Sequence, residues 1–191
     1  MGLSPEALRN DPQLWKRYSV RLNGQDPPNL PEIVPIAFEF LSSMNTVETL
    51  EKDNASTILM YGALTALGYH AAASPCDAFF TSRRVGAYFS SRNVNLAFTA
   101  IRCFEHRPFG QYAMFVSDQL VAVASCDTPT PSPIEMTIRG IAFLVLFQID
   151  PGFKFWSCLR SARDECVHGL LTWGADRESY SALARMILQY T

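Results

Sequence analysis

The chain has 191 residues, a length that fits one domain or one domain with an appended arm. Hydrophobic residues make up 48% of it and charged residues 18%, which excludes a disordered chain and leaves enough apolar surface for a core. The formal net charge of −2 excludes a strong overall attraction to nucleic acid or acidic lipid.

The cysteines and the first residues indicate an intracellular protein. There are five cysteines, an odd number, and none of them forms a C-x-x-C pair. We therefore expect reduced thiols and a location in the cytoplasm or the nucleus. The first residues contain no apolar run of the kind that a secretory signal needs.

The N-terminal part is predicted to contain an arm, one strand and one helix. Residues 1–14 have the composition of an arm with one helical turn. Residues 15–22, WKRYSVRL, alternate in polarity enough to form a short strand. A proline-rich stretch follows, and Pro31 is a favourable first residue for a helix over residues 31–44.

The next segment, residues 55–74, contains no formally charged residue apart from any proton on His70. It can be interpreted as a membrane span or as a buried helix. Many of its residues are alanine or glycine and its flanks are Asp53 and Asp77, whereas spanning helices are richer in large aliphatic residues and have basic flanks. We therefore expect a core helix and no transmembrane span.

After this segment the chain becomes rich in β-branched and aromatic residues, which favour strands. In residues 94–105, for example, Val94, Leu96 and Phe98 alternate with other residues and would share one face of a half-buried strand. Strands are predicted on this basis over residues 79–91, 94–105, 111–126, 134–149 and 153–162.

The last predicted element is an amphipathic helix over residues 175–191, with an apolar face formed by Tyr180, Leu183, Ala184, Ile187 and Leu188. Together the elements predict an α+β fold, an antiparallel β-sheet with helices packed on one face and a C-terminal amphipathic helix. The predicted organisation is an arm over residues 1–14 and a single α+β domain over residues 15–191.

Residues 103–112, CFEHRPFGQY, place a thiol, a carboxylate and an imidazole close together. A cysteine and a histidine can form a catalytic pair if their side chains meet. The same stretch is also explained as a hairpin corner, because Pro108 keeps the preceding residue extended and Gly110 allows a turn. We favour the corner, and we assign no catalytic residue and no cofactor.

Two pairs of residues have the close spacing that metal ligands often show. Cys103 and His106 have C-x-x-H spacing, and Cys166 and His168 have C-x-H spacing. Structural zinc sites usually have two such pairs, and these two would have to come together in the fold. We assign no metal ligand and leave open whether either pair does any chemistry.

Charge is distributed unevenly along the chain. Residues 1–57 carry eight acids and five bases, whereas residues 83–107 carry five arginines and one acid. Arginine is well suited to bidentate contacts with carboxylate or phosphate, so this segment is either a binding face or a solvated face of the sheet. The acidic N-terminal segment of a second copy would suit such a face and give head-to-tail association. The predicted binding residues are Arg83, Arg84, Arg92, Arg102 and Arg107.

The order of the predicted elements resembles that of rhabdovirus matrix proteins. It runs through RYSVRL, DPPNLP, two helices, EHRPFGQY and FQIDPGFKFWSCL, over residues 15–160. The resemblance implies a non-enzymatic protein that self-associates, condenses nucleocapsid and contacts membrane, with the virion as a further location. The chain departs from the family in being slightly acidic and in having neither P-P-x-Y nor P-[ST]-A-P. No site residue is carried over.

We therefore expect a non-catalytic structural protein that self-associates and binds a partner through the arginine-rich face, as a viral matrix protein would. The expected partners are a second copy, a nucleoprotein or an acidic partner segment, and peripheral contact with a membrane is an open alternative. The rival function is a small cone-shaped α+β enzyme of the dehydratase or isomerase type, with a pocket between sheet and helices. A deep pocket with a converging histidine and carboxylate would favour the enzyme.

Overall fold

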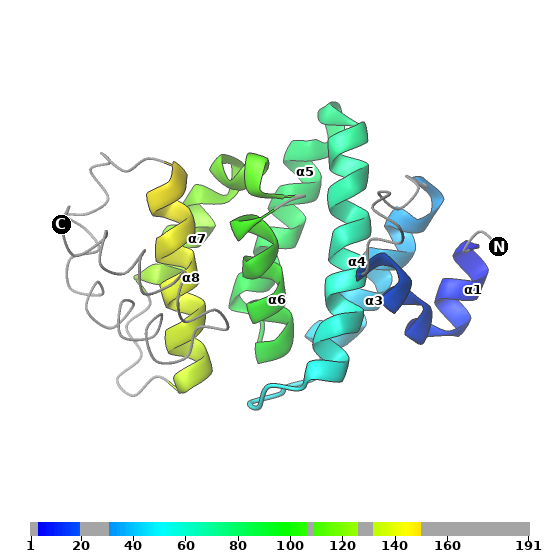
Figure 1. The fold of residues 1–191 in the computed structure, drawn as a ribbon, viewed down its shortest axis with the longest axis horizontal. Helices are drawn as coiled ribbons and strands as arrows, with labels where there is room; N and C mark the ends of the chain where they lie inside the picture. The colour runs from blue at the N-terminus through cyan, green and yellow to red at the C-terminus, as the bar shows by residue number, and fades with distance from the viewer. Residues whose placement is uncertain (1–3, 20–30, 107–108, 126–131, 150–191) are drawn as a thin grey trace. The chain divides into compact units, whose positions relative to one another are not determined.

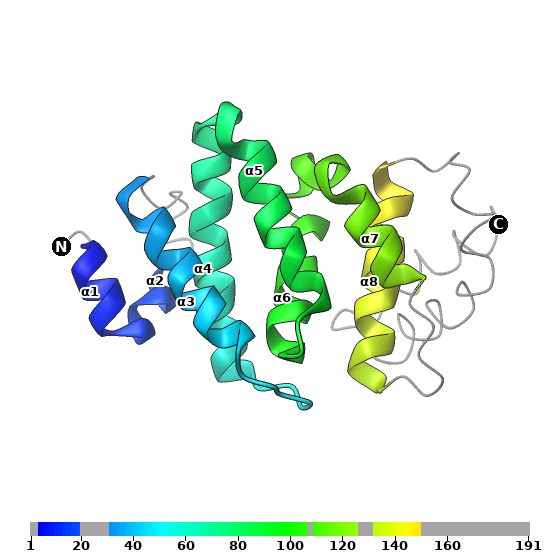
Figure 2. The ribbon, with the colours of Figure 1, turned by 180° about the vertical axis from the view of Figure 1, so that it is seen from behind.

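The computed structural model describes residues 4–19, 31–106, 109–125 and 132–149, and these residues are mostly helical (Figures 1 and 2). The chain divides into two compact units, Met1–Phe115 (unit 1) and Val116–Thr191 (unit 2). The described elements of unit 1 are α1 (Pro5–Asn10), η1 (Pro12–Trp15), α2 (Lys16–Ser19), η3 (Pro31–Ile33), α3 (Val34–Asn45), α4 (Asn54–Ala73), α5 (Pro75–Gly86), η4 (Ala87–Ser90), α6 (Val94–Glu105) and the 3₁₀ segment η5 (Gly110–Val116), which ends at the boundary. Those of unit 2 are α7 (Ser117–Ala124) and α8 (Pro133–Ile149).

Helix α4 is the centre of unit 1. Its neighbours are η1, α2 and α3 on the N-terminal side and α5 and α6 on the other, as Figures 1 and 2 show. Most of its middle, from Met60 to Gly68, is buried. The prediction of a core helix for this segment is therefore confirmed. Among the helices of the described residues, none combines the length and the apolar composition that a membrane span needs.

Local signals at both ends define α4. Asp53 is the N-cap, and its carboxylate accepts hydrogen bonds from the backbone N–H groups of Ala55 (3.1 Å) and Ser56 (3.0 Å) and from the Ser56 hydroxyl. These hydrogen bonds, with that of the Ser56 side chain first, hold the pKa of Asp53 below its usual value. At the other end the N–H of Ser74 donates to the His70 carbonyl, and Pro75 then starts α5 as a favourable first residue.

A glycine in α4 allows an unusually close approach between backbones. Gly62 lies against Trp15, at the junction of η1 and α2. A Cβ atom at position 62 would lie 1.9 Å from the Trp15 carbonyl oxygen and 2.7 Å from its carbonyl carbon. The absence of a side chain is therefore what lets the N-terminal segment pack on α4.

The N-terminal residues are packed on α3. Leu8 is buried, and the Arg9 guanidinium lies 3.1 Å from Glu39 of α3. The helix predicted over residues 31–44 is present as η3 followed by α3, so this prediction is confirmed. The strand predicted over residues 15–22 is wrong where it is described, because Lys16–Ser19 form α2.

The predicted α+β fold is wrong. In the described ranges there is no strand, and the β pairing found there is an isolated parallel bridge between Thr49 and Asn93. The predicted strands correspond to helices: residues 79–91 to α5 and η4, 94–105 to α6, 111–126 to η5 and α7, and 134–149 to α8. The predicted strand over residues 153–162 and the amphipathic helix over residues 175–191 lie outside the described residues.

The error at α6 has a clear physical cause. All residues from Val94 to Ile101 are buried, including the polar Asn95 and Thr99. Val94, Leu96 and Phe98 stand at every second position with other residues between them, and this alternation suggested a strand. The informative signal is the N-cap Asn93, whose side chain accepts hydrogen bonds from the N–H groups of Asn95 (3.1 Å) and Leu96 (3.2 Å).

A second missed signal starts α8 in unit 2. Ser132 and Glu135 form a capping box, in which the Ser132 N–H donates to the Glu135 carboxylate (2.7 Å) and the Glu135 N–H donates to the Ser132 hydroxyl (3.4 Å). Pro133 is the first helical residue. Residues 137–147 are all buried, the polar Thr137 and Arg139 among them, so this stretch of the helix has no exposed face.

Candidate functional site

The arginines that were predicted to form one face lie on separate elements of unit 1. Arg83 and Arg84 are in the last turn of α5, Arg92 precedes the N-cap of α6, and Arg102 is in the last turn of α6. Arg107 lies outside the described residues. The alignment expected from a sheet does not apply to these helices, and of the described four, Arg83 and Arg84 alone share an element.

Three of these guanidiniums make contacts inside unit 1. That of Arg84 lies over the ring of Phe38, 3.6 Å from its centroid, and that of Arg83 donates to the Phe115 carbonyl (3.3 Å). Arg102 lies 3.3 Å from the Glu105 carboxylate. Cation–π contacts and hydrogen bonds from charged groups each contribute about 0.5–3 kcal/mol. Reversing the charge of Arg83 and Arg84 would therefore disturb packing as well as any binding.

The stretch CFEHRPFGQY does not form a catalytic pair or a hairpin corner in its described part. Cys103 is buried within α6, and burial raises the pKa of its thiol to about 12, so it stays protonated near neutral pH. On a helix, Cys103 and Glu105 lie on nearly opposite sides. His106 is exposed and lies 3.6 Å from Glu105, not against the thiol.

Metal binding finds no support in the part of the chain that the structure describes. No group of three or more His, Cys, Asp or Glu side chains gathers there. Cys166 and His168 lie outside this part. Cys76 and Cys103 are free thiols, the first exposed and the second buried.

The raised pKa of Cys103 predicts a loss of stability in alkali. Its folded value of about 12 lies above the ordinary value of 9.0, and burial also raises the pKa of Tyr61. A group with a raised folded pKa contributes stability that is fully present below its unfolded pKa and is lost as pH rises through the folded pKa. We expect the free energy of unfolding to fall between about pH 9 and pH 12, and to fall less steeply in Cys103→Ala. Urea unfolding at several pH values measures this free energy. If it fell with pH equally steeply in the wild type and in Cys103→Ala, the prediction would be contradicted.

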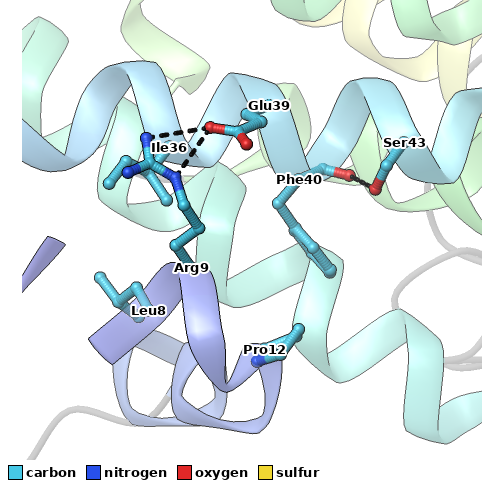
Figure 3. Close-up of a pocket in the computed structure, with 7 residues that line it drawn as sticks. All are labelled: Leu8, Arg9, Pro12, Ile36, Glu39, Phe40 and Ser43. Carbon is cyan, nitrogen blue, oxygen red and sulfur yellow. Dashed lines mark hydrogen bonds and ion pairs between the residues drawn. The ribbon is translucent and has the colours of Figure 1, made fainter. Parts of the chain in front are cut away.

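A small pocket lies between α1, η1 and α3, with a volume of about 170 Å³ (Figure 3). Arg9 reaches from α1 to the carboxylate of Glu39 at its edge, as Figure 3 shows, and both side chains are more than half exposed. The hydroxyl of Ser43 donates to the Phe40 carbonyl, and the carboxylate of the lining, that of Glu39, is paired with Arg9. The lining residues are Leu8, Arg9, Pro12, Ile36, Glu39, Phe40 and Ser43. The pocket lining contains no histidine beside the carboxylate, although that pair is the arrangement expected of the rival enzyme.

The most unusual feature of unit 1 is a group of large apolar side chains on its surface. The relative exposure of Phe80 and Met114 is 68% each, and Phe79 and Phe115 are also exposed. The rings touch in series: the centroid distances are 5.4 Å from Phe80 to Phe79, 5.5 Å from Phe79 to Phe115, and 5.9 Å from Phe115 to Tyr112. We call these five residues the aromatic surface.

Helix α5 is inverted relative to an ordinary amphipathic helix. It buries small and hydroxyl side chains, among them Ala78, Thr81 and Ser82, and it exposes Phe79 and Phe80. An ordinary surface helix does the reverse, because burying a Phe side chain is worth about 1.5–3 kcal/mol. Large contiguous exposed apolar patches are typical of surfaces that bind a protein, a membrane or a ligand.

The aromatic surface is held in place from both elements. The Tyr112 hydroxyl donates to the Ala71 carbonyl at the end of α4 (3.2 Å), and Arg83 of α5 donates to the Phe115 carbonyl of η5. These bonds join α5 and η5 to the α4–α5 corner. The exposed rings are therefore presented by ordered backbone.

From the sequence, the residues of the aromatic surface were predicted to lie on strands over residues 79–91 and 111–126. Ser74-Pro75, a frequent helix start, was the signal for a helix over residues 75–86. On such a helix Cys76, Phe79, Phe80 and Arg83 share one face.

Comparisons of the chain with protein-family models, with curated proteins and with solved structures found no match.

Proposed function

We propose that this chain is a non-catalytic assembly protein that self-associates through the aromatic surface. The inverted packing of α5 carries this proposal, because two phenylalanines are kept in water by a helix that buries alanine and serine instead. Contacts rich in aromatic residues, methionine and arginine are typical of protein interfaces. Arg83 and Arg84 follow Phe79 and Phe80 after about one turn of α5 and would supply the arginines.

The proposal narrows the function expected from the sequence. Of the predicted arginine-rich face it retains Arg83 and Arg84, and it adds the rings beside them. The resemblance to matrix proteins contributes nothing to it, because the predicted strands on which that resemblance depended are helices where they are described. An acidic apolar segment of a protein partner fits this surface best, and we place the protein in the cytoplasm or the nucleus, which suits its free thiols.

Sedimentation velocity over a range of protein concentrations tests the proposal. We expect the wild-type chain to associate, and Phe80→Asp or Met114→Asp to weaken association at least about tenfold, as expected for residues central to an interface. Both side chains are mostly exposed, so the melting temperature should change little. Gln13→Glu adds one negative charge at an exposed position of η1 and should associate like the wild type.

Two results would overturn the proposal. One is a wild-type chain that stays monomeric over the whole concentration range. The other is binding of the wild type, but not of Phe80→Asp, to vesicles containing anionic lipid, together with equal self-association of both proteins. That result would assign the aromatic surface to a membrane, because exposed rings beside arginines also suit a lipid interface.

A further inference from the structure

A second exposed apolar feature of unit 1 is the connection between α3 and α4, residues 46–53, which we call the acidic loop. Leu50 is 72% exposed and Val47 is 52% exposed. Glu48 and Glu51 beside them are exposed too. The Lys52 ammonium instead lies over the Phe98 ring of the same unit, 4.6 Å from its centroid. The tip of the loop is therefore aliphatic and carries two carboxylates.

Hydrogen bonds to the backbone on both sides of Leu50 hold the acidic loop in place. The Thr49 N–H donates to the Arg92 carbonyl (3.3 Å), and the Thr49 carbonyl accepts from the Val94 N–H (3.0 Å). On the other side, the Asn95 side chain donates to the Glu51 carbonyl (3.0 Å). Leu50 thus projects from a backbone fixed at the residues before and after it, and the loop is preorganised for binding.

The acidic loop and the aromatic surface are complementary. The loop offers aliphatic side chains with two carboxylates, and the surface offers aromatic rings with Arg83 and Arg84 nearby. Opposite charges across an interface guide encounter and register, while the apolar contacts supply most of the affinity.

The two features lie toward opposite ends of α4. The acidic loop leads into the first residue of α4, whereas α5, with Phe79 and Phe80 in its first two turns, begins after the last (Figures 1 and 2). A helix of 20 residues is about 30 Å long. The loop of one copy therefore cannot reach the aromatic surface of the same copy, and the complement must come from another molecule.

We propose that the acidic loop of one copy docks on the aromatic surface of a second copy, with Val47 and Leu50 against the rings and Glu48 and Glu51 facing Arg83 and Arg84. This inference rests on the proposed function and names the segment of the second copy that occupies the aromatic surface. The contact is heterologous, since each copy uses two different surfaces. Such contacts continue into open chains or close into rings.

Complementation between two variants tests this arrangement. Val47→Ser with Leu50→Ser removes the apolar tip of the loop, and Phe80→Asp damages the surface. Each variant alone should associate at least about tenfold more weakly than the wild type. A one-to-one mixture should form dimers and stop there, because one intact loop meets one intact surface and no further contact is possible. Light scattering after size exclusion reads the mass directly.

Controls separate this inference from the proposed function. Ile58→Ser, at an exposed aliphatic position of α4 outside both features, should associate like the wild type. Glu48→Gln with Glu51→Gln should weaken association and reduce its salt dependence. If Phe80→Asp abolishes association while the loop variant does not, or if the mixture stays monomeric, the loop is not the partner and the aromatic surface retains its role. If Phe80→Asp associates like the wild type, both proposals fail.

Discussion

Gly62→Ala is expected to destabilise unit 1 by about 3 kcal/mol or more, beyond the usual range for overpacked cores. The new Cβ would lie 1.9 Å from the Trp15 carbonyl oxygen, and this atom belongs to the backbone and cannot turn away. Relief requires the N-terminal segment to move off α4, which would expose Trp15, a fully buried side chain. Urea unfolding and a thermal melt measure the effect, and we expect the melting temperature to fall by more than about 10 °C.

Helix propensity alone would have the opposite effect on stability, and a matched substitution serves as the control. In a helix interior alanine is favoured over glycine by about 1 kcal/mol, so Gly62→Ala would stabilise the protein if no contact intervened. Ala72→Gly, at an exposed position of the same helix, measures the size of that propensity effect in this chain. A Gly62→Ala protein as stable as the wild type would show that the N-terminal segment does not pack on α4 as described.

Asn95→Ala is expected to cost about 2–4 kcal/mol and to loosen the acidic loop. The buried Asn95 side chain accepts a hydrogen bond from the Asp53 N–H (2.7 Å) and donates one to the Glu51 carbonyl (3.0 Å). Alanine would leave both backbone groups without this partner, and each group left unsatisfied costs about 1–3 kcal/mol. Urea unfolding measures the loss of global stability, and hydrogen exchange at the amide of Asp53 measures the loosening of the acidic loop.

The control for this prediction is Asn10→Ala, which removes an exposed asparagine from the end of α1 and should cost less than about 0.5 kcal/mol. Asn95→Ala should also weaken self-association, since an unpinned loop must be ordered again on binding. Unchanged exchange at Asp53 in Asn95→Ala would mean that this side chain does not hold the loop.

Two helices could be predicted from the sequence, because a local start signal or a composition typical of close-packed helices marked them. The segment beginning at Pro31 was recognised from that proline and its following apolar residues. The long helix after Asp53 was recognised as core because its alanines and glycines suit close packing and its flanks are acidic. In both cases local composition and tertiary burial favour the same structure.

The remaining helices were missed because their composition favoured strands. Both α6 and α8 are buried over most of their length and are rich in aromatic and β-branched residues, although α6 also contains Asn95 and Thr99 and α8 contains Arg139. Aromatic and β-branched residues then suggested strands, although β-propensity mainly reports burial beside neighbours. The caps at Asn93 and Ser132 were the local signals that opposed this interpretation.

By itself the sequence determined that the chain has a core, that its longest apolar segment belongs to that core, and that charge is divided between an acidic N-terminal part and an arginine-rich segment. Composition and charge are sums over residues, so they need no knowledge of neighbours. Only the tertiary structure decided which rings remain in water, that Phe79 and Phe80 face outward while Ala78 and Ser82 face α5's neighbours, and that residues 46–53 are pinned by Asn95. The exposure of a side chain and the preorganisation of a loop depend on contacts between residues distant in the chain. Such contacts leave no periodic pattern in the local sequence.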